Sequence, residues 1–166
     1  AIGQQVGKRA SAFGMEVVGY DPYASESVFA ENNIRQVVSF DEFLAATDVL
    51  SLHVPLTDTT RHIINRETIA KMKRSAYVIN TSRGGLIEEG DLYEALAEGA
   101  LAGAGLDVLE VEPPVSAPPL STLTNTVITP HAAFFSEESV VELRIKASQE
   151  VIRTLKEGQP KFCVNR

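Results

Sequence analysis

Residues 76–108 read AYVINTSRGGLIEEGDLYEALAEGALAGAGLDV, and this stretch decides the fold. Its first five residues form a short apolar run that predicts a strand. The segment Glu88–Glu98 carries apolar residues at helical spacing, and Gly99 follows as a helix stop. Leu101–Val108, rich in Gly and Ala, is then a second strand that a neighbour could approach closely. The strand–helix–strand order predicts two parallel strands joined by a crossover helix.

The same alternation continues on both sides of this unit. Strands are predicted at 16–20, 35–38, 48–53 and 126–129, and helices are predicted to begin after Ser39, Asn65 and Ser136. Several of the strands are apolar on both faces, which is typical of a parallel sheet covered by helices. The fold class is therefore predicted to be α/β, with a doubly wound, Rossmann-like parallel sheet.

The first fourteen residues, AIGQQVGKRASAFG, have the spacing of a helix that ends at Gly14. In one interpretation, Ala1, Ile2 and Gly3 are the last part of a glycine-rich phosphate-binding turn. The first strand and the earlier glycines would then lie upstream, so the sheet is expected to be truncated at its first strand. The alternative is an ordinary amphipathic helix.

Composition excludes several classes of function. The 166 residues are 44% hydrophobic and 22% charged, as in ordinary globular proteins, and the net charge is −7. That charge argues against a nucleic-acid footprint and against binding to anionic membranes. No apolar run approaches membrane-spanning length. The lone Cys163 gives neither an internal disulfide nor a metal-ligand spacing, so we expect no metal site and a reducing compartment such as the cytoplasm.

Asp21 ends the strand predicted at 16–20 and lies 18 positions after Gly3. A carboxylate there could accept hydrogen bonds from both hydroxyls of an adenosine ribose and would repel a 2′-phosphate. Asp21 therefore favours NAD over NADP. The alternative is a turn aspartate preceding Pro22.

Arg83 follows the strand that ends at Asn80 and precedes Gly84 and Gly85. The glycines let the backbone turn sharply beside a ligand, and a guanidinium there could bind a carboxylate through two hydrogen bonds. The alternative is a surface arginine paired with Glu88 or Glu89.

His131 lies after the last predicted strand and before a helix, whose N-terminus disfavours a charged imidazole. Glu112 could oppose that effect by accepting a hydrogen bond from the ring, which fixes the tautomer and favours imidazolium. Taken singly, these residues could be an exposed glutamate and a strand-end histidine. His53 is expected to present its backbone, not its ring, to a ligand, and His62 is interpreted as a loop residue.

These motifs together resemble the cofactor-binding domain of the D-isomer-specific 2-hydroxyacid dehydrogenases over essentially the whole chain. The matching stretches are FGM (13–15), GYDPY (19–23), LHVPLT (52–57), NTSRGG (80–85), LDV (106–108), EPP (112–114) and TPH (129–131). The run from His131 to Glu137, with Cys163-Val164-Asn165, looks closest to the C-terminal-binding-protein branch. That branch often has Trp-Tyr where this chain has Phe134-Phe135.

The resemblance implies a role for each candidate residue. Arg83 would bind the substrate carboxylate, and His131, supported by Glu112, would exchange the proton on the C2 oxygen. The implied NAD-binding positions are Ala1, Ile2, Gly3, Asp21, Val54, Pro55, Thr81, Ser82, Arg83, Asp107, His131, Ala132 and Ala133. Asp107 would face the nicotinamide amide.

The resemblance also implies an organisation and a function. Residues 1–157 would be an NAD-binding domain incomplete at its start, and 158–166 a tail that returns to an absent substrate domain. The residues 162–164 by themselves predict a strand that leaves the domain, with no obvious partner inside it. The function would be reversible hydride transfer between NAD and a small D-2-hydroxy or 2-oxo acid, in a homodimer, with the isolated chain inactive. The alternative is an NAD(H)-sensing, corepressor-like regulatory dimer of the same family.

Overall fold

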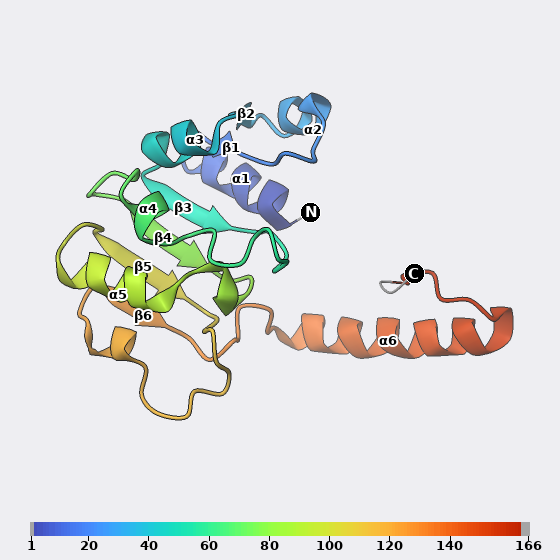
Figure 1. Ribbon diagram of the computed structural model, residues 1–166. Helices are drawn as coiled ribbons and strands as arrows, with labels where there is room; N and C mark the ends of the chain where they lie inside the picture. Colours follow the sequence, from blue (N-terminus) through green and yellow to red (C-terminus); the bar gives the residue numbers. More distant parts are fainter. Residues whose placement is uncertain (1, 164–166) are drawn as a thin grey trace. The chain divides into compact units, whose positions relative to one another are not determined.

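A computed structural model describes residues 2–163 and places them in alternating strands and helices (Figure 1). In chain order the elements are α1 (Ile2–Ala12), β1 (Val18–Gly19), α2 (Glu26–Glu31), β2 (Arg35–Gln36), α3 (Phe40–Ala46), β3 (Val49–Leu52), α4 (Arg66–Ile69), β4 (Tyr77–Asn80), η1 (Gly84–Leu86), α5 (Glu89–Ala97), β5 (Gly103–Leu106), η2 (Pro119–Thr122), β6 (Thr126–Ile128) and α6 (Glu137–Glu157). The chain divides after His131 into two compact units, and each is described by itself.

The first unit is built on parallel strands, which confirms the predicted fold class. β3, β4, β5 and β6 pair in that order, and β1 pairs with β2 in a separate two-stranded sheet. The register aligns Leu52 with Asn80, Asn80 with Leu106, and Leu106 with Ile128. The carboxyl ends of four neighbouring strands therefore finish on one line, and the segments that follow them emerge together at one edge (Figure 1).

The core lies between this four-stranded sheet and its helices. Leu50 of β3 and Val78 of β4 are buried, and α5 turns Leu92 and Leu96 inward, as its spacing predicted. A Cβ at Gly103 would lie 2.9 Å from Cε1 of Tyr77, so β5 can pair closely with β4 here only because it carries glycine.

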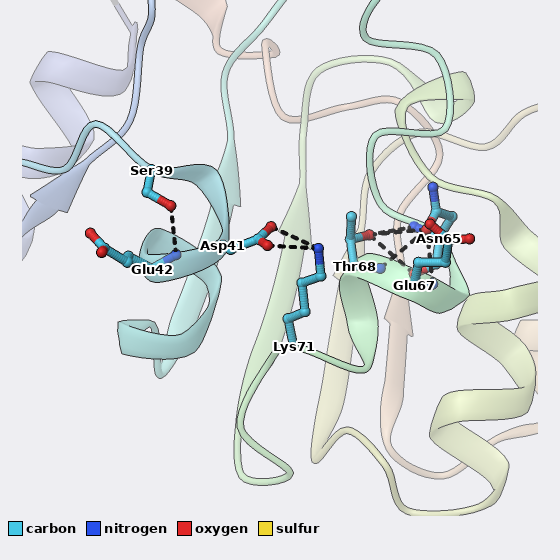
Figure 2. Close-up of polar contacts among 7 residues, drawn as sticks. All are labelled: Ser39, Asp41, Glu42, Asn65, Glu67, Thr68 and Lys71. Carbon is cyan, nitrogen blue, oxygen red and sulfur yellow. Dashed lines mark hydrogen bonds and ion pairs between the residues drawn. The ribbon is translucent and has the colours of Figure 1, made fainter.

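Side-chain caps fix where three helices begin, as the sequence predicted, and Figure 2 shows the caps of α3 and α4. Ser39 Oγ accepts the Glu42 N–H at 3.4 Å at the start of α3, and Asn65 Oδ1 accepts the Thr68 N–H at 3.2 Å at the start of α4. Ser136 accepts the Ser139 N–H at 3.0 Å at the start of α6. Such caps satisfy N–H groups that have no partner inside the helix.

Two predictions about the amino-terminal part were incomplete. Helix α2 was not predicted, because its six residues bury only Phe29 and its Ser25 cap makes no side-chain hydrogen bond. The first fourteen residues have helical spacing that puts Ile2 and Phe13 on one apolar face, but these side chains are 69% and 87% exposed, and α1 ends at Ala12. The helix instead buries Gly7, where a Cβ would lie 3.0 Å from Ile34 Cδ1.

The second unit begins at Ala132 and contains α6 with the short segments on either side of it. Gly158 ends α6 in the left-handed conformation, with φ of 74°, as expected for a helix stop. Most of the large apolar residues of α6, including Val141, Ile145, Ile152 and Leu155, are exposed, and no residue of the helix is buried within the described chain. The strand predicted for the tail is wrong for its described residues 162 and 163, because the Phe162 N–H is bonded to Glu150 of α6 at 3.1 Å and not to another strand; Val164 lies outside the described residues.

Candidate functional site

The strand ends that carry the candidate residues are joined by direct hydrogen bonds. Ser82 Oγ, after β4, donates to the carbonyl of Leu52 in β3 at 2.8 Å. The N–H of Asp107, after β5, donates to the carbonyl of Asn80 in β4 at 2.9 Å, and the His131 N–H donates to the carbonyl of Asp107 at 2.8 Å. The segments that follow β3, β4, β5 and β6 therefore form one connected rim.

Arg83 lies on this rim in an exposed turn. Asn80 is buried and shapes the turn, since its side chain accepts the Ser82 N–H at 3.0 Å and donates to the Arg83 carbonyl at 2.9 Å. The Arg83 guanidinium donates to the Ser82 carbonyl at 2.6 Å. Glu88 and Glu89, the alternative partners of Arg83, make other hydrogen bonds: Glu88 accepts the Asp91 N–H, and Glu89 accepts the Glu110 N–H. The guanidinium is thus exposed on the rim and does not pair with either glutamate.

Gly84 brings the Arg83 turn against the segment after β5. A Cβ on Gly84 would lie 2.0 Å from the carbonyl carbon and oxygen of Leu109 and 2.3 Å from the Glu110 nitrogen. These atoms belong to the backbone and cannot rotate away. Only glycine fits here, and its role is close approach, as the sequence suggested.

Gly84→Ala is therefore expected to destabilise the domain by at least about 1–3 kcal/mol, the usual cost of overpacking. Gly90→Ala is the matched control, because the new methyl group would lie 3.2 Å from the flexible end of Glu88. Alanine in the α5 helix should be neutral or stabilising by about 0.5–1 kcal/mol. Denaturant unfolding of the two variants checks this, and equal stabilities would contradict the close approach.

Glu112 and His131 form the hydrogen-bonded pair that the sequence suggested. His131 Nδ1 lies 2.7 Å from Glu112 Oε2, while Glu112 Oε1 accepts the Leu109 N–H at 2.8 Å. Burial raises the pKa of the Glu112 carboxyl, but the bonds from Leu109 and His131 outweigh it, so its pKa lies below the ordinary value. The ionised carboxylate can only accept, so the ring proton lies on Nδ1 and Nε2 is the nitrogen that can exchange a proton with a ligand.

His131 is also held in an uncommon backbone conformation, with φ of 53°. A non-glycine residue in this region costs on the order of 1–3 kcal/mol, and the surrounding structure must enforce it. Here the His131 N–H is fixed by the carbonyls of Asp107 and Thr129. Such residues concentrate at ligand sites, which agrees with a functional role for His131.

Asp107 is bonded to the backbone of His131 and is only 4% exposed. The Thr129 hydroxyl donates to its Oδ1, which helps to satisfy the buried carboxyl. Asp107 therefore forms part of the rim, where it links the end of β5 to the end of β6. Its backbone carbonyl holds His131, a contribution that sequence reasoning did not assign to it.

The candidate nucleotide residues lie around the other strand ends. Asp21 is exposed after β1, and its Oδ1 accepts the Tyr23 N–H at 2.9 Å. Ile2 and Gly3 form the first turn of α1, whose N–H groups favour an anion. A Cβ on Gly3 would lie 3.3 Å from Cδ2 of His53, so the helix start packs on that ring.

The ring of His53 is held by contacts within the protein. This agrees with the expectation that His53 presents its backbone, and not its ring, to a ligand. Its Nε2 lies 3.0 Å from Ser51 Oγ, and burial lowers its pKa below the ordinary value. Val54 and Pro55 follow it on the segment after β3, and Thr81 follows β4. Ala132 and Ala133 belong to the second unit, and Ala1 lies outside the described residues.

A second histidine–glutamate pair was missed by sequence reasoning, which interpreted His62 as a loop residue. His62 Nε2 lies 2.7 Å from Glu110 Oε1, and Arg61 Nη1 lies 3.6 Å from the same oxygen. His62 also has a positive φ, of 50°. The pair joins positions 48 residues apart, and no local spacing could have indicated it.

A hollow of about 540 Å³ opens at the opposite end of β1 and β2, lined by Glu16, Asn33, Arg35 and their neighbours. It is open and mainly polar, and none of the candidate residues lines it. Within residues 2–163, no helix is long and apolar enough to cross a membrane, and no group of three His, Cys, Asp or Glu could hold a metal ion.

Comparison with known proteins agrees with this geometry. Residues 1–133 match the family described as D-isomer specific 2-hydroxyacid dehydrogenase, NAD binding domain. The chain belongs to this family. It is 46% identical over 164 residues to D-3-phosphoglycerate dehydrogenase of Methanocaldococcus jannaschii, covering 99% of the chain and 31% of that protein. It is 44% identical over 156 residues to hydroxypyruvate reductase of Thermotoga maritima, covering 93% of the chain and 50% of that protein.

Solved structures of 2-hydroxyacid dehydrogenases share the fold. The NAD-complexed D-isomer specific 2-hydroxyacid dehydrogenase of Lactobacillus delbrueckii ssp. bulgaricus superimposes with a TM-score of 0.87 at 34% identity, covering 98% of this chain and 53% of that one. The chain thus spans about half or less of the relatives it matches. These relatives are dehydrogenases and a reductase, and they give no support to the corepressor-like alternative.

Proposed function

We propose that this chain is the cofactor-binding part of an NAD-dependent dehydrogenase that interconverts a D-2-hydroxy acid and its 2-oxo acid. The observation that carries the proposal is the Glu112–His131 pair on the same rim as the exposed Arg83. The test is oxidation of NADH by the full-length protein with pyruvate, glyoxylate, hydroxypyruvate and phosphohydroxypyruvate, followed by absorbance. No turnover with any 2-oxo acid would remove the proposal.

The rim residues have distinct roles in this reaction. The Arg83 guanidinium would bind the substrate carboxylate and polarise the C2 carbonyl. During reduction, Nε2 of His131 would give a proton to the C2 oxygen, and during oxidation it would take that proton back. Glu112 keeps the other ring nitrogen protonated and stabilises the imidazolium. NAD supplies the hydride chemistry when bound.

The described residues fit that cofactor. The first turn of α1, with Ile2 and Gly3, would hold the pyrophosphate, and Asp21 would accept the adenosine ribose hydroxyls through the oxygen that Tyr23 does not use. Val54, Pro55, Thr81, Ser82 and Asp107 would line the nicotinamide side.

The full-length protein is expected to prefer NADH over NADPH, because Asp21 would repel a 2′-phosphate and no Lys or Arg lies at 22–34. Asp21→Ala should narrow this preference by raising KM for NADH more than that for NADPH. Glu16→Ala is the control, since Glu16 pairs with Arg35 on the far side of β1 and β2. Comparing kcat/KM for both cofactors checks this, and a parental enzyme that uses NADPH equally well would contradict it.

The Glu112–His131 pair gives a pH-dependent prediction. The lowered pKa of Glu112 keeps this carboxylate ionised across the neutral range, where it stabilises imidazolium. Reduction needs imidazolium, so in Glu112→Gln the loss of reduction rate with rising pH should begin at lower pH. Oxidation near neutral pH should suffer less. Superimposable pH–rate profiles for reduction would show that Glu112 does not act on His131.

We further infer the organisation of the whole protein. Residues 1–157 would form the NAD-binding domain, and 158–166 would be a tail that leads back to a substrate domain. The isolated chain would then be inactive. We propose a cytoplasmic homodimer, which sedimentation of the full-length protein would test.

A further inference from the structure

Two histidine–glutamate pairs hold the same short segment after β5. Glu110 is bonded by His62 and Glu112 by His131, both at 2.7 Å, and both histidines have positive φ values, of 50° and 53°. The backbone of Glu110 is also fixed, because its N–H donates to Glu89 Oε1. The segment 109–112 is therefore held from both sides. Only the His131 side has a role in the proposed reaction.

The outer pair is connected to the reacting residues through backbone contacts. Glu112 can place Oε2 on His131 while Oε1 is held by the Leu109 N–H, and Leu109 adjoins Glu110. Gly84, next to Arg83, lies directly against the Leu109 carbonyl and the Glu110 nitrogen. The His62 N–H in turn donates to the Gly85 carbonyl at 2.8 Å. Displacing Glu110 would thus disturb both the Glu112 carboxylate and the Arg83 turn.

We propose that Glu110, held by His62 and Arg61, is a positioning residue that sets the Glu112 carboxylate on His131. It has no part in the proposed proton transfer and acts by fixing segment 109–112 against the Arg83–Gly85 turn. Residue 110 must supply an acceptor oxygen for this role, because the Nε2–H of His62 is a donor and needs an acceptor. The expected change in turnover rests on the proposed function, whereas the expected displacement of the Glu112 carboxylate does not.

The test compares Glu110→Ala with Glu110→Gln in the full-length protein. Glu110→Ala should lower kcat for reduction about 10-fold, as expected for loss of a coupled contact, with KM for the 2-oxo acid changed less. The pH at which the reduction rate begins to fall should be lower in Glu110→Ala than in the parental protein, as expected for Glu112→Gln. Adding Glu112→Gln to Glu110→Ala should lower this pH no further. Glu110→Gln keeps an acceptor oxygen and should restore most of the parental profile. Glu94→Ala, which breaks the ion pair with Arg66, is the matched control.

A second measurement separates this inference from the proposed function. In ¹⁵N-labelled protein, the downfield Nδ1–H signal of His131 should weaken or move in Glu110→Ala and persist in Glu110→Gln. If the parental protein lacks turnover, the proposed function fails and this signal alone decides the inference. The positioning role of Glu110 would be overturned if Glu110→Ala left the His131 Nδ1–H signal unchanged. It would also be overturned if this variant lowered Tm without shifting the pH profile of reduction. If Glu110→Ala does not fold, His62→Asn replaces it, since asparagine tolerates the positive φ but is too short to reach Glu110.

Discussion

Replacing His131 with asparagine is expected to lower kcat by about 10²–10⁴-fold in both directions, the usual cost of losing a general acid–base group. Asparagine is the informative substitution because it tolerates the φ of 53° that His131 adopts, whereas alanine would add backbone strain. The loss would therefore report the missing proton transfer and not a distorted rim. The pH dependence of reduction that Glu112 governs should disappear as well.

The measurement is steady-state turnover of the full-length protein, with NADH affinity and Tm recorded for the same samples. Both should stay close to parental values, since the rim hydrogen bond of residue 131 is made by its backbone N–H to Asp107. A variant that turns over within a few-fold of the parental rate would remove His131 from the mechanism.

Replacing Arg83 with glutamine is expected to lower kcat/KM for the 2-oxo acid by about 10²–10³-fold, comparable with the loss of a donor that stabilises developing charge on oxygen. The substrate carboxylate would lose its charged partner, so KM should rise while kcat falls. Arg83→Lys should recover only part of the activity, because an ammonium group lacks the planar pair of donors.

Arg74→Gln is the control for this prediction. Arg74 is an exposed arginine that donates to the Gly99 carbonyl, away from the strand-end rim. It should leave kcat/KM at the parental level. If Arg83→Gln and Arg74→Gln behave alike, Arg83 does not bind the substrate, and its position beside Gly84 serves only the turn.

The sequence by itself determined the fold class and most of the elements. Apolar runs and helical spacings identified each strand found in residues 2–163, and the caps at Ser39, Asn65 and Ser136 lie where they were predicted. These signals are local, so they can be recognised without the tertiary structure. Strand ends were overestimated by one or two residues, because pairing with a neighbour, and not composition, decides where a strand stops.

The sequence also identified the residues of the candidate site but not every contact that holds them together. Arg83, Glu112 and His131 could be chosen because parallel strands end at one edge of a sheet. The contact of His131 with Glu112 was predicted and is confirmed, whereas the close approach of Gly84 to the backbone of Leu109 in particular was decided by the tertiary structure.

The His62–Glu110 pair was decided only by the tertiary structure. His62 reaches Glu110 across 48 residues because its backbone adopts a positive φ and its N–H is anchored to Gly85. Packing of the segment after β5 against the Arg83 turn creates that environment, and nothing near His62 in the sequence encodes it. Likewise, the sequence could not predict that the apolar face of α1 is exposed. Helical periodicity shows only which residues share a face, whereas the burial of that face depends on which elements lie opposite the helix.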